Sequence, residues 1–596
     1  MIALIVLIPL IMAAAAVFSL RGRNASLSKY VALAGTLAAL ILLPLVSYGQ
    51  QSIPWFSAAG YQIAISVSVA PLNFILLAVV LAISPLVFVY SMGYMDKLSE
   101  QRRYYTEMLA FEAAMATFAV SGNFILMFIA WEFLSLTSYL LIGFWNSRDQ
   151  ANRAARKAIT TILIGDLAFL AAIVLFWSMF GTLQFSQILP AIATAPAARL
   201  YAAVLLLLAA VFTKSAQFPF HEWLIDAMEG PTPVSAFLHS STMVKAGVFM
   251  VMVLYPLFSA PQVSSIIMAI GAVTAVIATL AASREMHIKK VIAYSTIQEL
   301  SLMLVVISTG AVAAGAYFFF VQSFYKALLF FIAGIAMKAT GSEQLDKVAG
   351  LSSSRVALVS ALFGALSLAG FLPFSGFFAA SSIASALYGN LALYAIVSAI
   401  SMLTSFYIFR WIYYLSRKTR ASPAALSYMA QPASMVYPPA ILAAATLAVS
   451  VLFFYFNGFV SGGAANAQVP GALTLTMGDS IILTALAAAG AAAAYGFYWK
   501  GAAARADSRG SMRIVHTGHA VNLAYNAASS FTVSLCEGVA AFDRFVSDGF
   551  DRVGRLTVAS GYSIRRVSVG NVNSYALIFA VSAAVIFVAV YFVVAA

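Results

Sequence analysis

The sequence predicts an all-α integral membrane protein with about sixteen transmembrane helices. Of its 596 residues, 63% are hydrophobic and only 9% are charged, and its mean hydropathy is +0.95. Soluble domains carry about 25% charged residues, so lipid surrounds most of this chain. The net charge of +13 comes from Lys and Arg in short loops between apolar runs, and it therefore does not indicate a nucleic-acid partner.

Sixteen apolar segments are long enough to be predicted as spans. They cover residues 2–20, 29–48, 64–94, 105–120, 122–144, 158–180, 199–228, 232–255, 263–282, 287–308, 312–338, 353–387, 391–415, 436–457, 476–498 and 573–595. Arg21 and Arg23 follow the first run, which reverses the charge order of a signal peptide. That run is therefore predicted to be a span, with cleavage after its alanine cluster as the alternative.

Loop charges give an independent check on this topology. Lys and Arg occur in the loops at 21–29, 97–103, 148–157, 284–290, 338–355, 410–420 and 500–513. They are absent from the intervening loops at 49–62, 181–198, 256–262, 308–314, 388–390 and 458–475. The loop at 221–232 lies on the basic side but is acidic. The positive-inside rule then places both termini on the outer side of a prokaryotic plasma membrane, as an even number of spans requires.

Two predicted spans are interrupted by proline in polar or glycine-rich surroundings. Pro219 follows Lys214 within the sequence KSAQFP, and Pro373 lies between Gly370 and Gly376 in GFLPFSG. Proline breaks the helical hydrogen-bond ladder, and the freed backbone groups persist at membrane depth only inside protein or beside water. Paired broken helices indicate a transport pathway. The alternative is that proline is simply more common in membrane helices.

The C-terminal region is predicted to lie on the membrane before crossing it once. Within residues 506–571, apolar and charged residues alternate at helical spacing from 511 onward, which is typical of an amphipathic surface helix. Fifty such residues would reach roughly 75 Å. A terminal membrane anchor at 572–596 follows. The alternative for the surface segment is a bent or partly disordered linker.

Ionisable residues recur inside the predicted spans. They are Glu132, Asp166, Lys214, His239, Lys245, Glu299 and Lys326. Each charge costs about 2.5–3.5 kcal/mol at a helix centre, so these groups are expected to face one another or water. Acids that alternate with lysines suit proton transfer. The alternatives are that Asp166 forms an ion pair that only fixes packing, and that His239 is a hydrogen-bonded core histidine.

The stretch from Lys214 to His239, KSAQFPFHEWLIDAMEGPTPVSAFLH, resembles the signature of proton-conducting antiporter-like subunits. This family includes the large membrane subunits of respiratory complex I, of its archaeal and hydrogenase relatives and of Mrp antiporters. Further matching motifs are WE at 131–132, SYLLIGF at 138–144, IKKVIAYST at 288–296 and FYKALLF at 324–330. The resemblance covers residues 60–415 most strongly. The surface helix and last span resemble the distal, NuoL-type member.

The resemblance implies a fold of two inverted five-helix repeats with broken helices. These repeats would occupy residues 105–255 and 256–415, with further membrane helices at 1–104 and 416–505. Carried over residue by residue, Glu132 and Lys214 resemble the family's glutamate–lysine pair, Lys245 its bridging lysine and His239 the neighbouring histidine. Lys289 and Lys326 match lysines of the second half.

The second half departs from the family pattern. Gln322 and Phe318 stand where NuoL-type members carry histidines, and Ala380 stands where the broken helix usually carries a lysine. Glu299 is an acid where relatives have a neutral polar residue. We hypothesise that protons pass Lys326 and Glu299 in place of the lost lysine. The competing hypothesis is that this half conducts little.

The resemblance implies a non-redox subunit of a quinone-reducing proton pump. Cys536 is the only cysteine, so no iron–sulfur cluster can be held by cysteines of this chain, and there is no nucleotide fingerprint. Quinone, iron–sulfur clusters and flavin or another electron-input cofactor are expected on partner subunits. Neighbouring antiporter-like subunits and the lipid bilayer are the expected partners. The alternatives are an Mrp-type cation/proton antiporter subunit, and a non-transporting membrane scaffold or a partner of an inorganic-carbon uptake complex.

Overall fold

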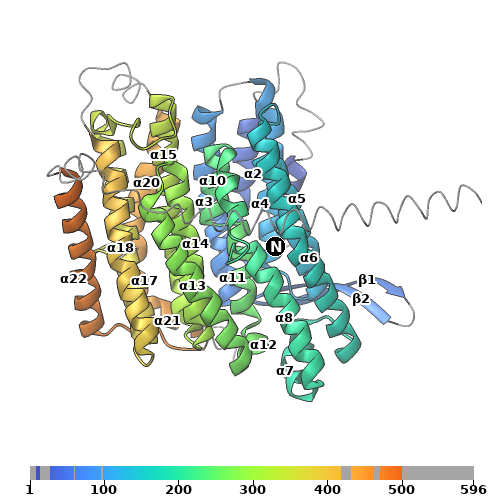
Figure 1. Cartoon of the computed structure of the whole chain (residues 1–596). Helices are drawn as coiled ribbons and strands as arrows, with labels where there is room; N and C mark the ends of the chain where they lie inside the picture. Colours follow the sequence, from blue (N-terminus) through green and yellow to red (C-terminus); the bar gives the residue numbers. More distant parts are fainter. Residues whose placement is uncertain are drawn as a thin grey trace, which may run out of the picture. The chain divides into compact units, whose positions relative to one another are not determined.

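A computed structural model describes residues 8–13, 27–58, 61–95, 98–417, 431–461 and 470–499. The predicted surface helix at 506–571 and the anchor at 572–596 lie outside the described residues, as does most of the first predicted span. In the described part the long helices run roughly parallel (Figure 1). Helix α22 (Met477–Ala494) lies at one edge and α6 (Asp149–Phe180) at the other.

The N-terminal helices are separated by a β-hairpin. The elements α2, β1, β2 and α3 span Ser28–Leu42, Gly49–Ala58, Tyr61–Val69 and Pro71–Tyr94. The two strands pair antiparallel. The predicted span at 64–94 is therefore wrong in its first residues. From Ile63 to Val69, β-branched residues alternate with Ala and Ser at the period of a strand, and Pro71 begins the helix.

Two successive groups of helices, followed by three further helices, form the rest of the bundle. The first group comprises α4 (Leu98–Ala119), α5 (Phe124–Ile142), α6, α7 (Phe185–Ala191), α8 (Ala197–Lys214), α9 (Glu222–Asp226), α10 (Thr232–Ser240), α11 (Met243–Val253) and α12 (Tyr255–Phe258). The second comprises α13 (Pro261–Arg284), α14 (Ile288–Ser308), α15 (Val312–Thr340), α16 (Arg355–Leu368), α17 (Ser375–Leu387) and α18 (Leu391–Ser416). Helices α20 (Ala433–Val451), α21 (Phe453–Ser461) and α22 follow.

Within the described residues, 12 helices are long and apolar enough to cross a membrane. Charged residues in the first half of α4 lower its hydropathy, and α16 and α17 are each shorter than a full span. The chain is therefore a multi-pass membrane protein. The total of sixteen spans stays a prediction.

Several predicted spans are divided in the structure. Pro219 lies between α8 and α9, and Pro373 lies between α16 and α17. The predicted span at 232–255 matches one apolar stretch at Thr232–Val253 that is long enough to cross a membrane, but it consists of two helices, because α10 ends at Ser240 and α11 begins at Met243. Between them, Thr242 Oγ1 donates to the carbonyl of Phe237 at 2.9 Å, so a side chain bonds the helix's own backbone. The helix expected at 436–457 is likewise divided between α20 and α21.

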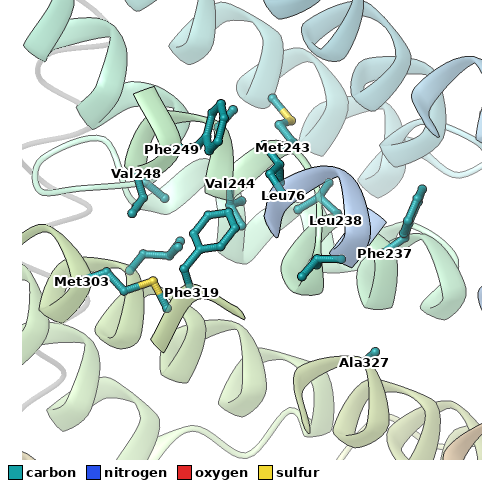
Figure 2. Close-up of a cluster of buried hydrophobic side chains, with 14 of the residues drawn as sticks. Leu76, Phe237, Leu238, Met243, Val244, Val248, Phe249, Met303, Phe319 and Ala327 are labelled. Atoms are coloured by element: carbon teal, nitrogen blue, oxygen red, sulfur yellow. The ribbon is translucent and has the colours of Figure 1, made fainter. Parts of the chain in front are cut away.

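Helices α14 and α15 form the buried centre of the bundle. Nearly all of their side chains are buried, and large apolar residues from α10, α11, α14 and α15 pack together (Figure 2). Helix α6 instead exposes Leu163, Leu167 and Val174, which suits a surface that faces lipid. The bundle thus has a protein-packed interior and an apolar exterior.

A short backbone clip joins the start of α14 to the loop after α15. Ile288 N donates to the carbonyl of Glu343 at 2.8 Å, and Leu345 N donates to the carbonyl of Met286 at 2.7 Å. His287 Nε2 lies 2.9 Å from Glu343 Oε2. This hydrogen bond holds the pKa of the Glu343 carboxyl below its ordinary value of 4.5, and the positive charge of Lys289 adds to the effect.

Replacing this carboxylate is expected to destabilise the protein at neutral pH. Because the folded pKa lies below 4.5, the stabilisation is complete above that value and is lost as the pH falls through the folded pKa. Glu343 is about half exposed, so Glu343→Gln should cost about 0.5–1 kcal/mol at pH 7. Thermal unfolding in detergent should show this deficit shrinking below pH 4.5. The nearby Asp346→Asn serves as control, and an equal deficit at all pH values would contradict the assignment.

Candidate functional site

The first charged cluster surrounds Lys214, the last residue of α8. Its Nζ donates to Ser135 Oγ at 2.5 Å and to the carbonyl of Trp131 at 3.1 Å, and Asp166 Oδ1 lies 3.6 Å away. Trp131 Nε1 and Ser135 Oγ both donate to Asp166, at 2.6 Å and 2.9 Å. The Lys214 side chain is fully buried. Charge-assisted hydrogen bonds therefore join α5, α6 and α8 at one buried point.

Close contact between α6 and α8 places the two charges of this cluster side by side. A β-carbon at Gly165 would overlap Thr213 Oγ1, so glycine is needed where α6 meets α8. Asp166 and Lys214 directly follow these two residues in the sequence. The carbonyl of Thr213, beside the helix break, accepts a hydrogen bond from Trp223 Nε1 at 2.8 Å. Local packing thus fixes the ion pair at the end of α8.

The structure places Asp166, rather than Glu132, against Lys214. Trp131 and Ser135 lie one turn apart on the face of α5 that contacts Lys214. Glu132 is rotated by about 100° from Trp131, because a helix has 3.6 residues per turn. It is partly exposed and forms no hydrogen bond or ion pair with a described residue. The expected direct contact between Glu132 and Lys214 is therefore not formed in this structure.

The second cluster contains Lys245 of α11 without a carboxylate partner among the described residues. Its Nζ donates to the carbonyl of Phe319 at 2.5 Å and to Ser323 Oγ, and it lies 4.4 Å from the centre of the Phe319 ring. The neighbouring Val244, Val248 and Phe319 belong to the apolar cluster in Figure 2. Lys245 is thus a fully buried ammonium held by a hydroxyl, a carbonyl and an aromatic face.

The third cluster pairs Lys326 of α15 with Glu299 of α14. Lys326 Nζ lies 2.8 Å from Glu299 Oε2 and donates to Ser295 Oγ at 2.5 Å. Gln322 Nε2 and Tyr325 OH donate to the Glu299 carboxylate at 3.2 Å and 2.9 Å. Gln322 therefore contacts the acid, as its position one turn before Lys326 allows. The acid singled out in the sequence lies in direct contact with the expected lysine.

Serine and tryptophan partners of these clusters were missed by sequence reasoning. Ser135, Ser295 and Ser323 each accept a hydrogen bond from one of the buried lysines. Serine is common in membrane helices, so its presence alone is a weak signal. Ser135 nevertheless lies three residues after Glu132, and Ser323 lies three residues before Lys326. The sequence signal that could have found these serines was their position, about one helical turn from a charged residue inside a predicted span.

His239 and Lys289 lie outside these three clusters. The His239 ring is fully buried, stacks near Phe330 with centroids 4.7 Å apart, and neither ring nitrogen has a partner among the described residues. Among the described residues there is therefore no hydrogen bond that would support the interpretation of His239 as a hydrogen-bonded core histidine. Lys289 donates to the carbonyls of Met228 and Gly230, the latter at 2.9 Å. It fixes the loop before α10.

Short polar links connect the clusters. Ser323 bonds Lys245 and precedes Lys326 by one helical turn on α15. Ser215, the residue after Lys214, links the first cluster to the second. Its Oγ donates to the carbonyl of Val244, the residue before Lys245, at 2.9 Å. Among the residues that the structure describes, no group of three His, Cys, Asp or Glu side chains could hold a metal ion.

Two protein families match the sequence. The family described as NADH:quinone oxidoreductase/Mrp antiporter, TM, matches residues 121–406. The family described as NADH-ubiquinone oxidoreductase (complex I), chain 5 N-terminus, matches residues 55–105. The first match contains all three buried lysine clusters.

Curated relatives align with the same part of the chain. NAD(P)H-quinone oxidoreductase subunit 5 from the organellar chromatophore of Paulinella chromatophora is 35% identical over 381 residues, covering 61% of this chain and 57% of the relative. NADH-quinone oxidoreductase subunit L of Rickettsia felis is 33% identical over 419 residues, covering 68% and 64%. Subunit L of Mycobacterium tuberculosis is 35% identical over 347 residues, covering 57% and 54%. The chain therefore spans less than two thirds of these relatives.

Solved structures share the fold. The Mrp complex from Dietzia sp. DQ12-45-1b matches with a TM-score of 0.74 at 23% identity, covering 100% of this chain and 63% of that chain. The membrane-bound sulfane sulfur reductase, an archaeal respiratory membrane complex, matches with a TM-score of 0.67 at 20% identity, covering 82% and 99%. Residues 55–105 and 121–406 of the chain are therefore similar to membrane subunits of NADH:quinone oxidoreductases and, over 121–406, of Mrp antiporters.

Proposed function

We propose that this chain is the proton-translocating, subunit L-type membrane subunit of a complex I-like, redox-driven pump. The observation that carries the proposal is the set of buried lysines, Lys214, Lys245 and Lys326, each bonded to a serine hydroxyl. Ionisable groups at this depth are costly and are retained where they carry ions or protons. The names of the curated relatives support the redox-driven class.

The proposed relay runs from the partly exposed Glu132 to Lys214, then through Lys245 to Lys326 and Glu299. Of the three lysines, Lys214 and Lys326 each contact a carboxylate, whereas Lys245 contacts only neutral oxygen atoms and an aromatic ring. A charge on Lys245 is therefore stabilised least, and its occupancy by a proton depends on the charges at Lys214 and Lys326. His239 lies near this path as a buried ring with two free nitrogens among the described residues.

The two halves of the relay correspond to the proposed inverted repeats at 105–255 and 256–415. Each half contains one helix interrupted near a proline, α8–α9 in the first and α16–α17 in the second. Each half also contributes one fully buried lysine with a directly contacting carboxylate. These shared features support a repeat of the same transport unit.

The electron-transfer chemistry is proposed to belong to partner subunits. In this proposal the chain contributes no redox centre, and quinone, iron–sulfur clusters and flavin or another electron-input cofactor lie on other subunits. Neighbouring antiporter-like membrane subunits would contact it within a prokaryotic plasma membrane, with both termini outside. An Mrp-type cation/proton antiporter is the second candidate, favoured by the structural match to the Dietzia Mrp complex at a TM-score of 0.74.

Copurification separates these two candidates. A tagged chain isolated in mild detergent should carry iron–sulfur proteins and transfer electrons to quinone. Isolation with small membrane subunits alone, together with sodium-dependent proton exchange in vesicles, would favour the Mrp-type candidate instead.

Lys245→Met should lower proton transport by the reconstituted complex to one tenth or less. The substitution keeps an unbranched side chain but removes the group that exchanges protons between the outer clusters. Proton movement into vesicles is measured with a pH-sensitive dye and expressed per electron transferred to quinone. The exposed Lys347→Met provides the matched control. A Lys245→Met complex that pumps at the control ratio would exclude this lysine from the pathway.

Glu299→Gln should abolish or sharply reduce proton pumping. The amide oxygen can still accept one of the two hydrogen bonds that Tyr325 and Gln322 donate, but the amide cannot take up a proton. Glu299→Asp retains the carboxylate and is expected to restore part of the activity in the same assay. Full pumping by the glutamine variant would support the competing hypothesis that the second half conducts little.

Asp166 and Glu132 are expected to differ in their effect on stability. Asp166→Asn leaves Lys214 buried without its contacting charge, so the loss should be on the order of 3 kcal/mol. Glu132→Gln removes no described contact and should leave thermal unfolding in detergent nearly unchanged, while still lowering pumping. Equal stability of the two variants would contradict the distinction drawn between them.

A further inference from the structure

A cavity of about 50 Å³ lies beside Ala380, at the position where the resemblance led us to expect a lysine. Glu299 and Tyr325 line one side, and the break between α16 and α17 lines another through Gly370 and Gly376. Because one water needs roughly 10–15 Å³ of such volume, the space has room for about three to five waters. The small side chain of Ala380 therefore leaves open space beside the acid.

Close backbone packing at the helix break maintains this space. A β-carbon at Gly376 would overlap the carbonyl oxygen of Ser367, so the two half-helices meet tightly there. A β-carbon at Gly370 would lie 3.6 Å from the Ala380 β-carbon. A longer side chain at position 380 would therefore enter the cavity, because the break itself leaves it no other room.

A stripe of hydroxyl groups on α18 leads away from the cavity. Tyr394, Ser398, Ser401 and Ser405 recur at intervals of three or four residues, which places them on one face of the helix. Ser401 lines the cavity. The buried Oγ atoms of Ser398 and Ser405 have no hydrogen-bond partner among the described residues. Buried hydroxyls are normally satisfied by protein or water, so these positions indicate a hydrated path.

Asp479 lies at the end of this stripe, near the start of α22. Its carboxylate accepts hydrogen bonds from Tyr394 OH at 2.9 Å, from Ser385 Oγ at 3.1 Å and from Thr476 Oγ1. Only 3% of the residue is exposed. Leu483 follows it by one helical turn, or about 6 Å, and lines the cavity. Asp479 therefore lies between the cavity and the side of the bundle where the loops between the helices contain no Lys or Arg.

We propose that Asp479 is the terminal proton site of an exit route that leaves Glu299 through the cavity and along the α18 stripe. The proposal rests on the proton-pumping function above. A proton released by the Glu299 carboxyl passes through waters to the Asp479 carboxylate, which then releases it to bulk water. Lys326 reprotonates Glu299 and then takes up the next proton through Lys245 from the first half of the relay, so each group returns to its starting state. The route uses α22, a helix outside the proposed repeats, in place of a lysine at position 380.

The main test compares proton pumping by Asp479 and Lys326 variants in the complete reconstituted complex. Asp479→Asn should lower protons pumped per electron at least fivefold, and Asp479→Glu should restore most of the loss. Ser480→Ala on the same helix serves as control. Normal pumping by Asp479→Asn, with pumping lost in Lys326→Met, would overturn the exit route alone. Normal pumping by both variants would overturn the proposed function as well.

Hydration of the route can be measured without pumping. In a Cys536→Ser background, Ser401→Cys, which lines the cavity, should react with a small, charged thiol reagent added to vesicles. Adding Ala380→Leu should slow this reaction at least tenfold by filling the cavity, whereas Ala399→Leu on the exposed face of α18 should not. A Ser401→Cys variant that resists the reagent, or labelling unaffected by Ala380→Leu, would exclude a water path through the cavity.

Discussion

A lysine ammonium buried among membrane helices must find oxygen atoms within the protein, because no bulk water reaches it there. The helix arrangement at each cluster meets this requirement. Lys214 obtains a carbonyl, a hydroxyl and a carboxylate from two neighbouring helices. Lys326 obtains a hydroxyl and a carboxylate from α14 alone. Lys245, which has only a carbonyl, a hydroxyl and a ring, is the least neutralised of the three.

The two halves meet this requirement in different ways. In the first half, the lysine lies at the end of the broken helix itself, where Gly165 brings α6 close enough for Asp166 to reach it. In the second half, both partners lie on unbroken central helices, and the broken helix contributes a cavity rather than a charge. The interrupted helices therefore share their backbone arrangement but not the chemistry they carry.

The sequence predicted most of the spans in the described part of the chain, and the burial of these charges, because both depend on composition along the chain. Glu299 and Lys326 were expected to act together, and they form a direct ion pair. Which acid faces Lys214 could not be predicted, because it depends on the rotation of α5 and on the close approach at Gly165. The hairpin before α3 was missed because apolar strands and spans share composition. The break at Thr242 depends on a side-chain hydrogen bond that no proline marks.

In the proposed relay, the serine partners distinguish a proton-carrying site from a fixed ion pair. A hydroxyl can accept a hydrogen bond from an ammonium or, after rotating, donate one to a neutral amine. Ser135 already accepts from Lys214 and donates to Asp166, and Ser323 accepts from Lys245 while donating to the carbonyl of Phe319. Each site can therefore satisfy its lysine in both protonation states. A carboxylate alone would favour only the charged form, and a proton held in that way would not move on.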